Sequence, residues 1–298
     1  MNFIIDNYIL VWICIIGLCL GSFFNVVILR SLSNESIVFP PSKCPKCGNK
    51  LQPWHNIPVL SYLFLRGKCA FCKKRISIQY PLIELITMVL FGFCFIKFGI
   101  TWQGLFGIII ISCLLIMTMT DLKEKLVDCN IAIALAIIGI LYNWTVNETL
   151  LDSVYGLLTG IVIMEIIARC GYLFTNNRAI GEADTYVTGA LGASFGLAGL
   201  LQVLLNSIFA SMLFIIPIFL YKQYKNNNKA VCILFILFSL SALAFKTISQ
   251  DWYLLLALIF SGLLLTILIL KNLKKDPCPM YLPLVPALSL GALYFLFF

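Results

Sequence analysis

Charged residues are scarce in this sequence. They make up 11% of its 298 residues, against about 25% in ordinary soluble domains, whereas 61% of the residues are hydrophobic. A soluble domain cannot bury so much apolar surface, so the surroundings of the chain must be largely lipid. The composition therefore excludes a soluble enzyme, a disordered chain and a disulfide-stapled secreted module. An acidic or basic tail is also missing, so we expect no nucleic-acid partner.

Histidine occurs only once, as His55. A metalloprotease motif of the H-E-x-x-H type needs two histidines on one helix face, so this class of site is excluded. A Ser-His-Asp triad would have to use His55. The chain also has no G-x-G-x-x-G segment after a strand, so the sequence by itself predicts no site for a nucleotide-like cofactor.

Long apolar runs are abundant. A transmembrane helix needs about 20 apolar residues, and the runs fit helices because barrel strands alternate apolar and polar residues over about ten positions. We therefore predict an all-α polytopic integral membrane protein with about ten spans. The predicted spans cover residues 8–29, 81–98, 103–120, 131–146, 150–172, 185–200, 203–221, 230–247, 252–270 and 281–297.

The placement of lysine and arginine predicts the orientation. The longest polar segment, 30–80, carries nine of these cations, which places it in the cytoplasm. Counting crossings from there puts 19 of the 21 cations on that side and leaves only Lys97 and Lys246 outside. No cation precedes the first span, so we do not expect a cleaved signal peptide. The predicted parts are a first span (1–30), a cytoplasmic cysteine loop (31–80) and a membrane catalytic bundle (81–298).

Four of the twelve cysteines form two C-x-x-C pairs in the cytoplasmic loop. Cys44 with Cys47 and Cys69 with Cys72 have the spacing of structural zinc sites, in which four thiolates complete a tetrahedron. His55 lies between the pairs and is not needed as a ligand. Two other interpretations stay open. The pairs could exchange disulfides in a thiol–disulfide function, or they could be two unrelated turns.

Two of the thirteen acidic residues stand out by their position. Asp121 follows an apolar run at the cytoplasmic end of the third span, and Asp184 begins the sixth span at the same face. Ionisable groups at membrane depth are costly and are functional candidates. Two close carboxylates in a low dielectric would share one proton, so one could activate water while the other polarises a peptide carbonyl.

The other acids at helix ends have simpler interpretations. Asp128 is expected to cap the fourth helix, and Glu84 is expected in a first helical turn after Pro81. Periodicity alone leaves open whether Asp121 and Asp184 face each other.

Several segments resemble the bacterial prepilin peptidases, also called type IV leader peptidases. Residues 181–184, Gly-Glu-Ala-Asp, are similar to the G-x-G-D motif of that family, and the cysteine loop follows the family order around both C-x-x-C pairs. The resemblance covers about residues 17–200 and returns at 283–288. The matching segments are 17–30, 44–48, 55–62, 65–72, 76–77, 80–85, 121–128 and 181–184.

The resemblance implies a membrane aspartic endopeptidase that removes the leader of type IV prepilins or pseudopilins at the cytoplasmic face of the inner membrane. Many members of the family then N-methylate the new N-terminus with S-adenosylmethionine. About eight spans are usual in the family, so 230–270 would be an added hairpin. The resemblance assigns catalysis to Asp121 and Asp184, and structural zinc to Cys44, Cys47, Cys69 and Cys72.

Three residues depart from the family pattern. Ala183 replaces the second glycine of G-x-G-D, which is tolerable unless that position needs a positive φ. Tyr186 stands where a lysine is common, and Val127 where a proline is usual. The departures leave open a catalytically inactive relative that serves pilus assembly, and the cysteine pairs leave open a membrane thiol–disulfide carrier.

Overall fold

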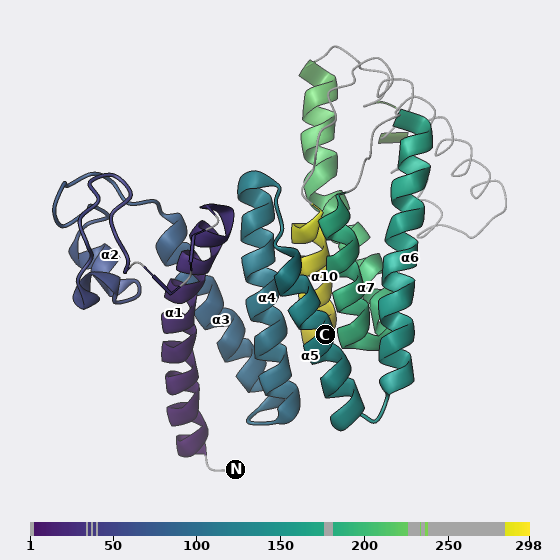
Figure 1. Ribbon diagram of the computed structural model, residues 1–298, viewed down its shortest axis with the longest axis horizontal. Helices are drawn as coiled ribbons and strands as arrows, with labels where there is room; N and C mark the ends of the chain where they lie inside the picture. The colour runs from purple at the N-terminus through teal and green to yellow at the C-terminus, as the bar shows by residue number, and fades with distance from the viewer. Residues whose placement is uncertain are drawn as a thin grey trace. The chain divides into compact units, whose positions relative to one another are not determined.

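The structure is a computed structural model of the 298-residue chain. It describes residues 3–33, 35–36, 38–39, 41–175, 181–225, 233, 236–237 and 284–298. Within these residues every regular element is a helix, which confirms the predicted all-α class. The elements are α1 (Phe3–Ser33), η1 (Pro53–Asn56), α2 (Leu60–Phe64), α3 (Gln79–Phe98), α4 (Trp102–Glu124), α5 (Cys129–Thr145), α6 (Leu150–Thr175), α7 (Glu182–Lys225) and α10 (Val285–Phe297) (Figure 1).

Five of the described helices are long and apolar enough to cross a membrane, namely α1, α3, α4, α6 and α7. Helices α5 and α10 are apolar but shorter, with 17 and 13 residues. These seven helices coincide with eight of the predicted spans, because two of the spans fall within α7. The other two predicted spans, 230–247 and 252–270, lie almost entirely outside the described residues, so the count of ten is not confirmed.

Helix α7 consists of two helical segments that meet at Gly196, whose φ of 72° and ψ of −178° are not helical. Glycine adopts this conformation without the steric cost that a Cβ would bring. The Asp152 carboxylate accepts a hydrogen bond from the N–H of Leu197 at 3.2 Å and so caps the second segment. The sequence places the boundary between these two spans at 201–202, and the structure has it at Gly196.

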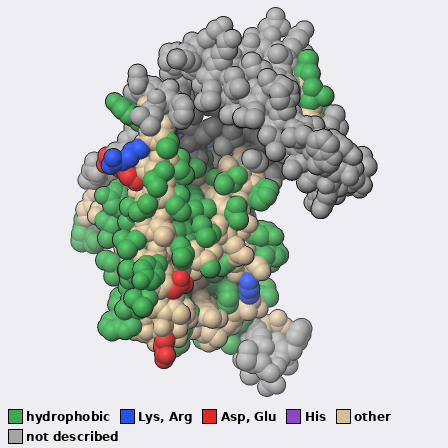
Figure 2. Space-filling view, turned by 90° about the vertical axis from the view of Figure 1, so that its right-hand side faces the viewer, with side chains coloured by type: hydrophobic (Ala, Val, Ile, Leu, Met, Phe, Trp, Pro, Cys, Tyr) green, Lys and Arg blue, Asp and Glu red, His purple; other side chains and the backbone are tan. Residues whose placement is uncertain are grey.

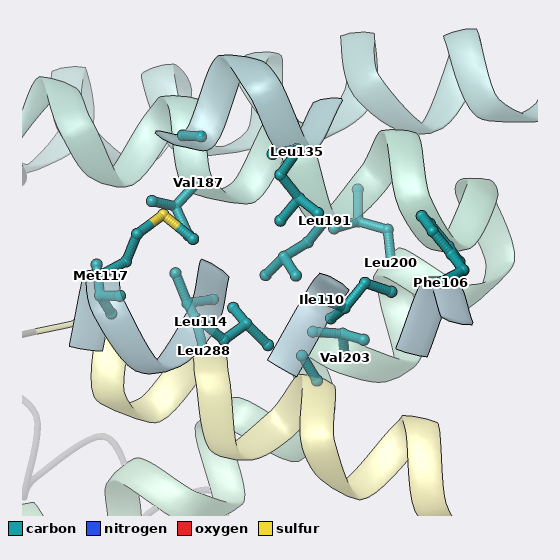
Figure 3. Close-up of a cluster of buried hydrophobic side chains, with 14 residues drawn as sticks. Phe106, Ile110, Leu114, Met117, Leu135, Val187, Leu191, Leu200, Val203 and Leu288 are labelled. Atoms are coloured by element: carbon teal, nitrogen blue, oxygen red, sulfur yellow. The ribbon is translucent and has the colours of Figure 1, made fainter. Parts of the chain in front are cut away.

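Most of the described helices belong to one compact unit, which comprises residues 1–167, 181–207 and 283–298. A second unit comprises 168–180 and 208–282, most of which lie outside the described residues. The candidate site residues all belong to the first unit. Its larger core joins α4, α5, α7 and α10, and Figure 3 shows Leu114, Leu191 and Leu288 directed toward one another. Lipid tails are as apolar as leucine, so this core stabilises the unit through close packing.

Apolar side chains also cover the outside of the first unit. Figure 2 shows hydrophobic side chains over most of its described surface in that view, with few charged groups among them. Phe93 is 57% exposed and Ile96 is 68% exposed. A water-soluble protein rarely exposes an apolar surface of this extent, so the surface fits a lipid bilayer.

Helices α1 and α3 pack through two glycines of α1. A Cβ at Gly17 would lie 2.9 Å from the Cα of Met88, and one at Gly21 would lie 2.7 Å from the Cα of Glu84. Both contacts involve the main chain of α3, so a side-chain rotation cannot relieve them. The spacing of four residues places both glycines on one face of α1, as in closely packed membrane helices.

Substituting Gly17→Leu is therefore expected to push α1 away from α3 and to cost roughly 1–3 kcal/mol, the usual penalty for overpacking. The midpoint of thermal unfolding of the detergent-solubilised protein measures this loss. Ile16→Leu is the matched control, because Ile16 is 50% exposed and should tolerate the change. Equal midpoints for Gly17→Leu and the wild type would contradict the importance of the contact.

Candidate active site and metal centre

Asp121 lies in the last turn of α4. This helix is capped at its start by Thr101 and ends at Lys125, whose left-handed φ is 55°. The Asp121 side chain is only 6% exposed. Its Oδ2 atom accepts a hydrogen bond from the backbone N–H of Val285, the first residue of α10, at 3.2 Å. The positive end of the α10 dipole therefore faces this acid.

Asp184 lies in the first turn of α7, where the helix dipole favours an acid. Its Oδ2 atom accepts a hydrogen bond from the backbone N–H of Gly181 at 3.2 Å. Met117, four residues before Asp121, and Val187, three residues after Asp184, belong to the same buried core and lie side by side in Figure 3. Two helices that are distant in the sequence thus bring the two predicted residues together.

The departure at Ala183 carries little structural cost. Ala183 lies inside the first turn of α7 and does not have a positive φ, so this position does not require glycine. Tyr186 is 46% exposed and lines an apolar cavity of about 210 Å³ with residues of α5 and α6. Val127 packs against the larger core.

Two carboxylates in this arrangement can perform acid–base chemistry on an amide. Close carboxylates in a poorly solvated site keep one proton between them. The ionised member can then accept a proton from water while the protonated member donates to a carbonyl oxygen. The N–H of Val285 was not predicted as a partner of Asp121. Pro286 could have indicated that a helix begins here, because proline is favoured in the first turn of a helix.

The four predicted metal ligands also come together. The sulfur atoms of Cys44, Cys47, Cys69 and Cys72 all lie within 4.8 Å of one another, and those of Cys44 and Cys72 are 4.0 Å apart. A tetrahedral zinc ion with Zn–S bonds of about 2.3 Å would separate its sulfur ligands by about 3.8 Å. The cluster therefore fits zinc with little adjustment, and four thiolates complete the site.

The two C-x-x-C turns share one local geometry. The N–H of Gly48 donates to the carbonyl of Cys44 at 2.9 Å, and the N–H of Lys73 donates to the carbonyl of Cys69 at 3.1 Å. The φ angles of Gly48 and Lys73 are 72° and 57°. Each turn thus reverses the chain four residues after its first cysteine and directs both of its cysteines to the cluster.

The pKa values of Cys69 and Cys47 are shifted in opposite directions. The N–H groups of Cys72 and Phe71 lower the pKa of Cys69 to about 6, which favours the thiolate that a metal requires. The amide of Asn49 lowers the pKa of Cys47, but desolvation and the neighbouring thiols together raise it to about 11. Four adjacent thiolates repel one another, and a bound divalent cation would offset that repulsion.

His55 and Asp128 have the roles expected from the sequence. The His55 Nδ1 atom accepts a hydrogen bond from the N–H of Gln52 at 3.4 Å, and its ring packs edge-on against Phe71. His55 is therefore a loop residue outside the cysteine cluster. Asp128 caps α5, since its Oδ1 atom accepts a hydrogen bond from the N–H of Asn130 at 2.9 Å.

The expectation for Glu84 was wrong. The residue lies in the second turn of α3, because this helix begins at Gln79 rather than at Pro81. The Glu84 side chain is 6% exposed. Its Oε2 atom accepts a hydrogen bond from the N–H of Val59, in the cysteine loop, at 2.7 Å. Glu84 thus connects the loop to a membrane helix, which a helix-dipole argument does not predict.

Two family models match the chain. The Bacterial Peptidase A24 N-terminal domain matches residues 15–98, and the Type IV leader peptidase family matches residues 108–216. The first match contains the cysteine cluster, and the second contains Asp121 and Asp184. No solved structure matches the chain.

Several similar proteins bear the name prepilin leader peptidase/N-methyltransferase. The protein of Myxococcus xanthus is 36% identical over 203 residues, which cover 68% of this chain and 60% of the relative. The protein of Neisseria gonorrhoeae is 35% identical over 211 residues, which cover 62% of this chain and 74% of the relative. The protein of Pseudomonas aeruginosa is 31% identical over 227 residues, which cover 68% of this chain and 78% of the relative. The similarity thus spans less than two thirds of the Myxococcus protein and about three quarters of the other two.

Proposed function

Because the chain belongs to the type IV leader peptidase family, we propose that it is a membrane aspartic endopeptidase acting on type IV prepilins or pseudopilins. It removes the leader and then N-methylates the new N-terminus. The placement of Asp121 and Asp184 at adjoining ends of α4 and α7 carries the peptidase half of this proposal. The names of the relatives support both halves.

In the proposed peptidase reaction Asp121 and Asp184 share a proton. The ionised carboxylate accepts a proton from water as the water oxygen bonds to the carbonyl carbon, and the other carboxyl donates its proton to the carbonyl oxygen. The tetrahedral intermediate then collapses, the C–N bond breaks, and the pair supplies a proton to the leaving amine. The hydrogen bond from the N–H of Val285 holds the Asp121 carboxylate in position.

The proposed cofactors are one structural zinc ion and S-adenosylmethionine. Zinc bound by Cys44, Cys47, Cys69 and Cys72 would join the two turns of the loop, and it would supply no chemistry at the aspartates. S-adenosylmethionine would supply the methyl group, in keeping with the N-methyltransferase names of the relatives.

The proposed location is the inner, or cytoplasmic, membrane, with the cysteine loop and both aspartates on the cytoplasmic side. The excess of lysine and arginine in segment 30–80 supports this orientation. Ser31, at the loop end of α1, lies 3.4 Å from the Asp128 carboxylate, which follows α4. The loop and the aspartates therefore share one end of the helices. The proposed partners are the bilayer and a substrate helix in the adjacent lipid, and no nucleic acid.

Co-expression with a prepilin, in a host that lacks its own prepilin peptidase, tests the proposal. Mass spectrometry of the pilin should show loss of the leader and the added mass of one methyl group. Intact prepilin with several substrates would contradict the peptidase function. Cleaved pilin without the methyl group would contradict only the methylation step.

A further inference from the structure

A cavity of about 950 Å³ lies between α1, α3 and the cysteine loop. Pockets that hold small molecules and cofactors usually measure roughly 300–1,000 Å³. The walls combine apolar and aromatic side chains, among them Phe23 and Tyr62, with a small number of polar groups. Asp121 and Asp184 are not among the described residues that line this cavity, so it is separate from the candidate peptidase site.

Two buried polar side chains line the cavity where it meets the helices. Asn25 is 2% exposed and Glu84 is 6% exposed. The Asn25 side chain donates to the carbonyl of Tyr80 at 3.1 Å, which fixes α1 against the start of α3. Glu84 accepts the N–H of Val59 at 2.7 Å. A buried carboxylate is costly unless it is paired, and one that lines a cavity is suited to a cationic ligand.

The backbone beside Glu84 is strained. Val59 has a φ of 59° and a ψ of −48°, a region that β-branched residues rarely enter. Strain of this kind persists only where the surrounding structure holds it, and it collects at ligand sites. Here the hydrogen bond from Val59 to Glu84 holds it, so the strain and the buried acid belong to one arrangement.

Charges of both signs line the cavity. Its helix side carries Glu84 and Arg30, and its loop side carries Glu35, Lys43, Lys46, Lys74 and Arg75. S-adenosylmethionine carries a sulfonium and an ammonium cation, a carboxylate and an adenine ring. Glu84 can pair with the cationic groups, the lysines can pair with the carboxylate, and the apolar walls can hold the adenine ring.

We propose that this cavity binds S-adenosylmethionine and that Glu84 is a binding residue for its cationic part. The inference rests on the methyltransferase half of the proposed function. In the transfer, a bond forms between the nitrogen of the new N-terminus and the methyl carbon as the sulfur–carbon bond breaks. S-adenosylhomocysteine leaves, and the proton of the amine passes to water. Ser31 and Asp128 link the cavity end of α1 to the aspartate end of α4, so the cleaved N-terminus need not cross the membrane.

Glu84→Gln in the full-length, detergent-solubilised protein tests the assignment. Glutamine keeps the shape of the side chain and an acceptor for the N–H of Val59, but it removes the charge. Equilibrium binding of radiolabelled S-adenosylmethionine should weaken by roughly tenfold or more. The zinc content and the thermal unfolding midpoint of the same preparation should stay close to those of the wild type, which shows that the variant is folded. Glu148→Gln removes one charge from the exposed α5–α6 connection and should bind as the wild type does.

A cavity-filling variant provides the second test. Ser61 lines the cavity, whereas Leu63 of the same helix, α2, is 64% exposed. Ser61→Trp should therefore weaken binding, and Leu63→Trp should not. Wild-type binding that neither Glu84→Gln nor Ser61→Trp weakens would overturn the cavity assignment and leave the proposed methyltransferase intact. A wild-type protein that cleaves prepilin but neither binds the donor nor methylates would overturn both.

Discussion

Asp184→Asn is expected to reduce the rate of prepilin cleavage by roughly 10²–10⁴-fold, the range that a positioned acid or base contributes. Asparagine preserves the shape of the side chain and can still accept the N–H of Gly181. It can neither share a proton with Asp121 nor take one from water. Asp121→Asn should cause a loss of similar size, because the two carboxylates act as one unit. Initial rates of leader removal by the purified variants measure both effects.

The matched control is Asp128→Asn. This change removes the same charge at the same end of the helices, and asparagine caps a helix about as well as aspartate does. Cleavage by this variant should equal that of the wild type. Normal cleavage by either Asp121→Asn or Asp184→Asn would refute the catalytic pair. A comparable loss in Asp128→Asn would point to a general effect of charge at this end of the helices.

The second large effect concerns the metal. The purified wild-type protein should contain one zinc ion per chain, and replacing Cys44 and Cys69 together by serine should abolish it, because each turn then retains a single thiolate. Apparent free energies for structural zinc in small peptides reach about 10–16 kcal/mol. Among its described residues, the cysteine loop has η1 and α2 as its only helices, and both are short, so the loop should also lose its order. Metal analysis and limited proteolysis of segment 41–76 measure the two consequences.

Cys113→Ser combined with Cys129→Ser is the control, since both residues lie outside the cluster. This variant should retain its zinc and its resistance to protease. Wild-type protein without zinc would refute the metal site. Reversible oxidation of the four loop cysteines to disulfides would instead favour the thiol–disulfide alternative.

The metal cluster was predictable because its information is local. Each C-x-x-C turn brings its own two sulfur atoms together within a few residues, and only the meeting of the two turns is a tertiary event. The aspartate pair depends on longer-range information. The position of each acid at a helix end follows from the apolar runs, but periodicity cannot decide which helices are neighbours. The similarity of residues 181–184 to a known motif made that connection.

Other features depend on contacts that no local pattern records. The burial of Glu84 follows from the close approach of Gly21 and from the path of the cysteine loop. The division of α7 at Gly196 follows from the Asp152 side chain of another helix. In both cases the residue types fit several local structures, and tertiary packing selects one of them.

The hydrogen bond between Asp121 and Val285 joins residues that are 164 positions apart. During biosynthesis α4 leaves the ribosome long before α10, so the nascent chain carries Asp121 without this partner for most of its elongation. A shift in the position at which α10 begins would present a different amide to Asp121, so that boundary should resist change.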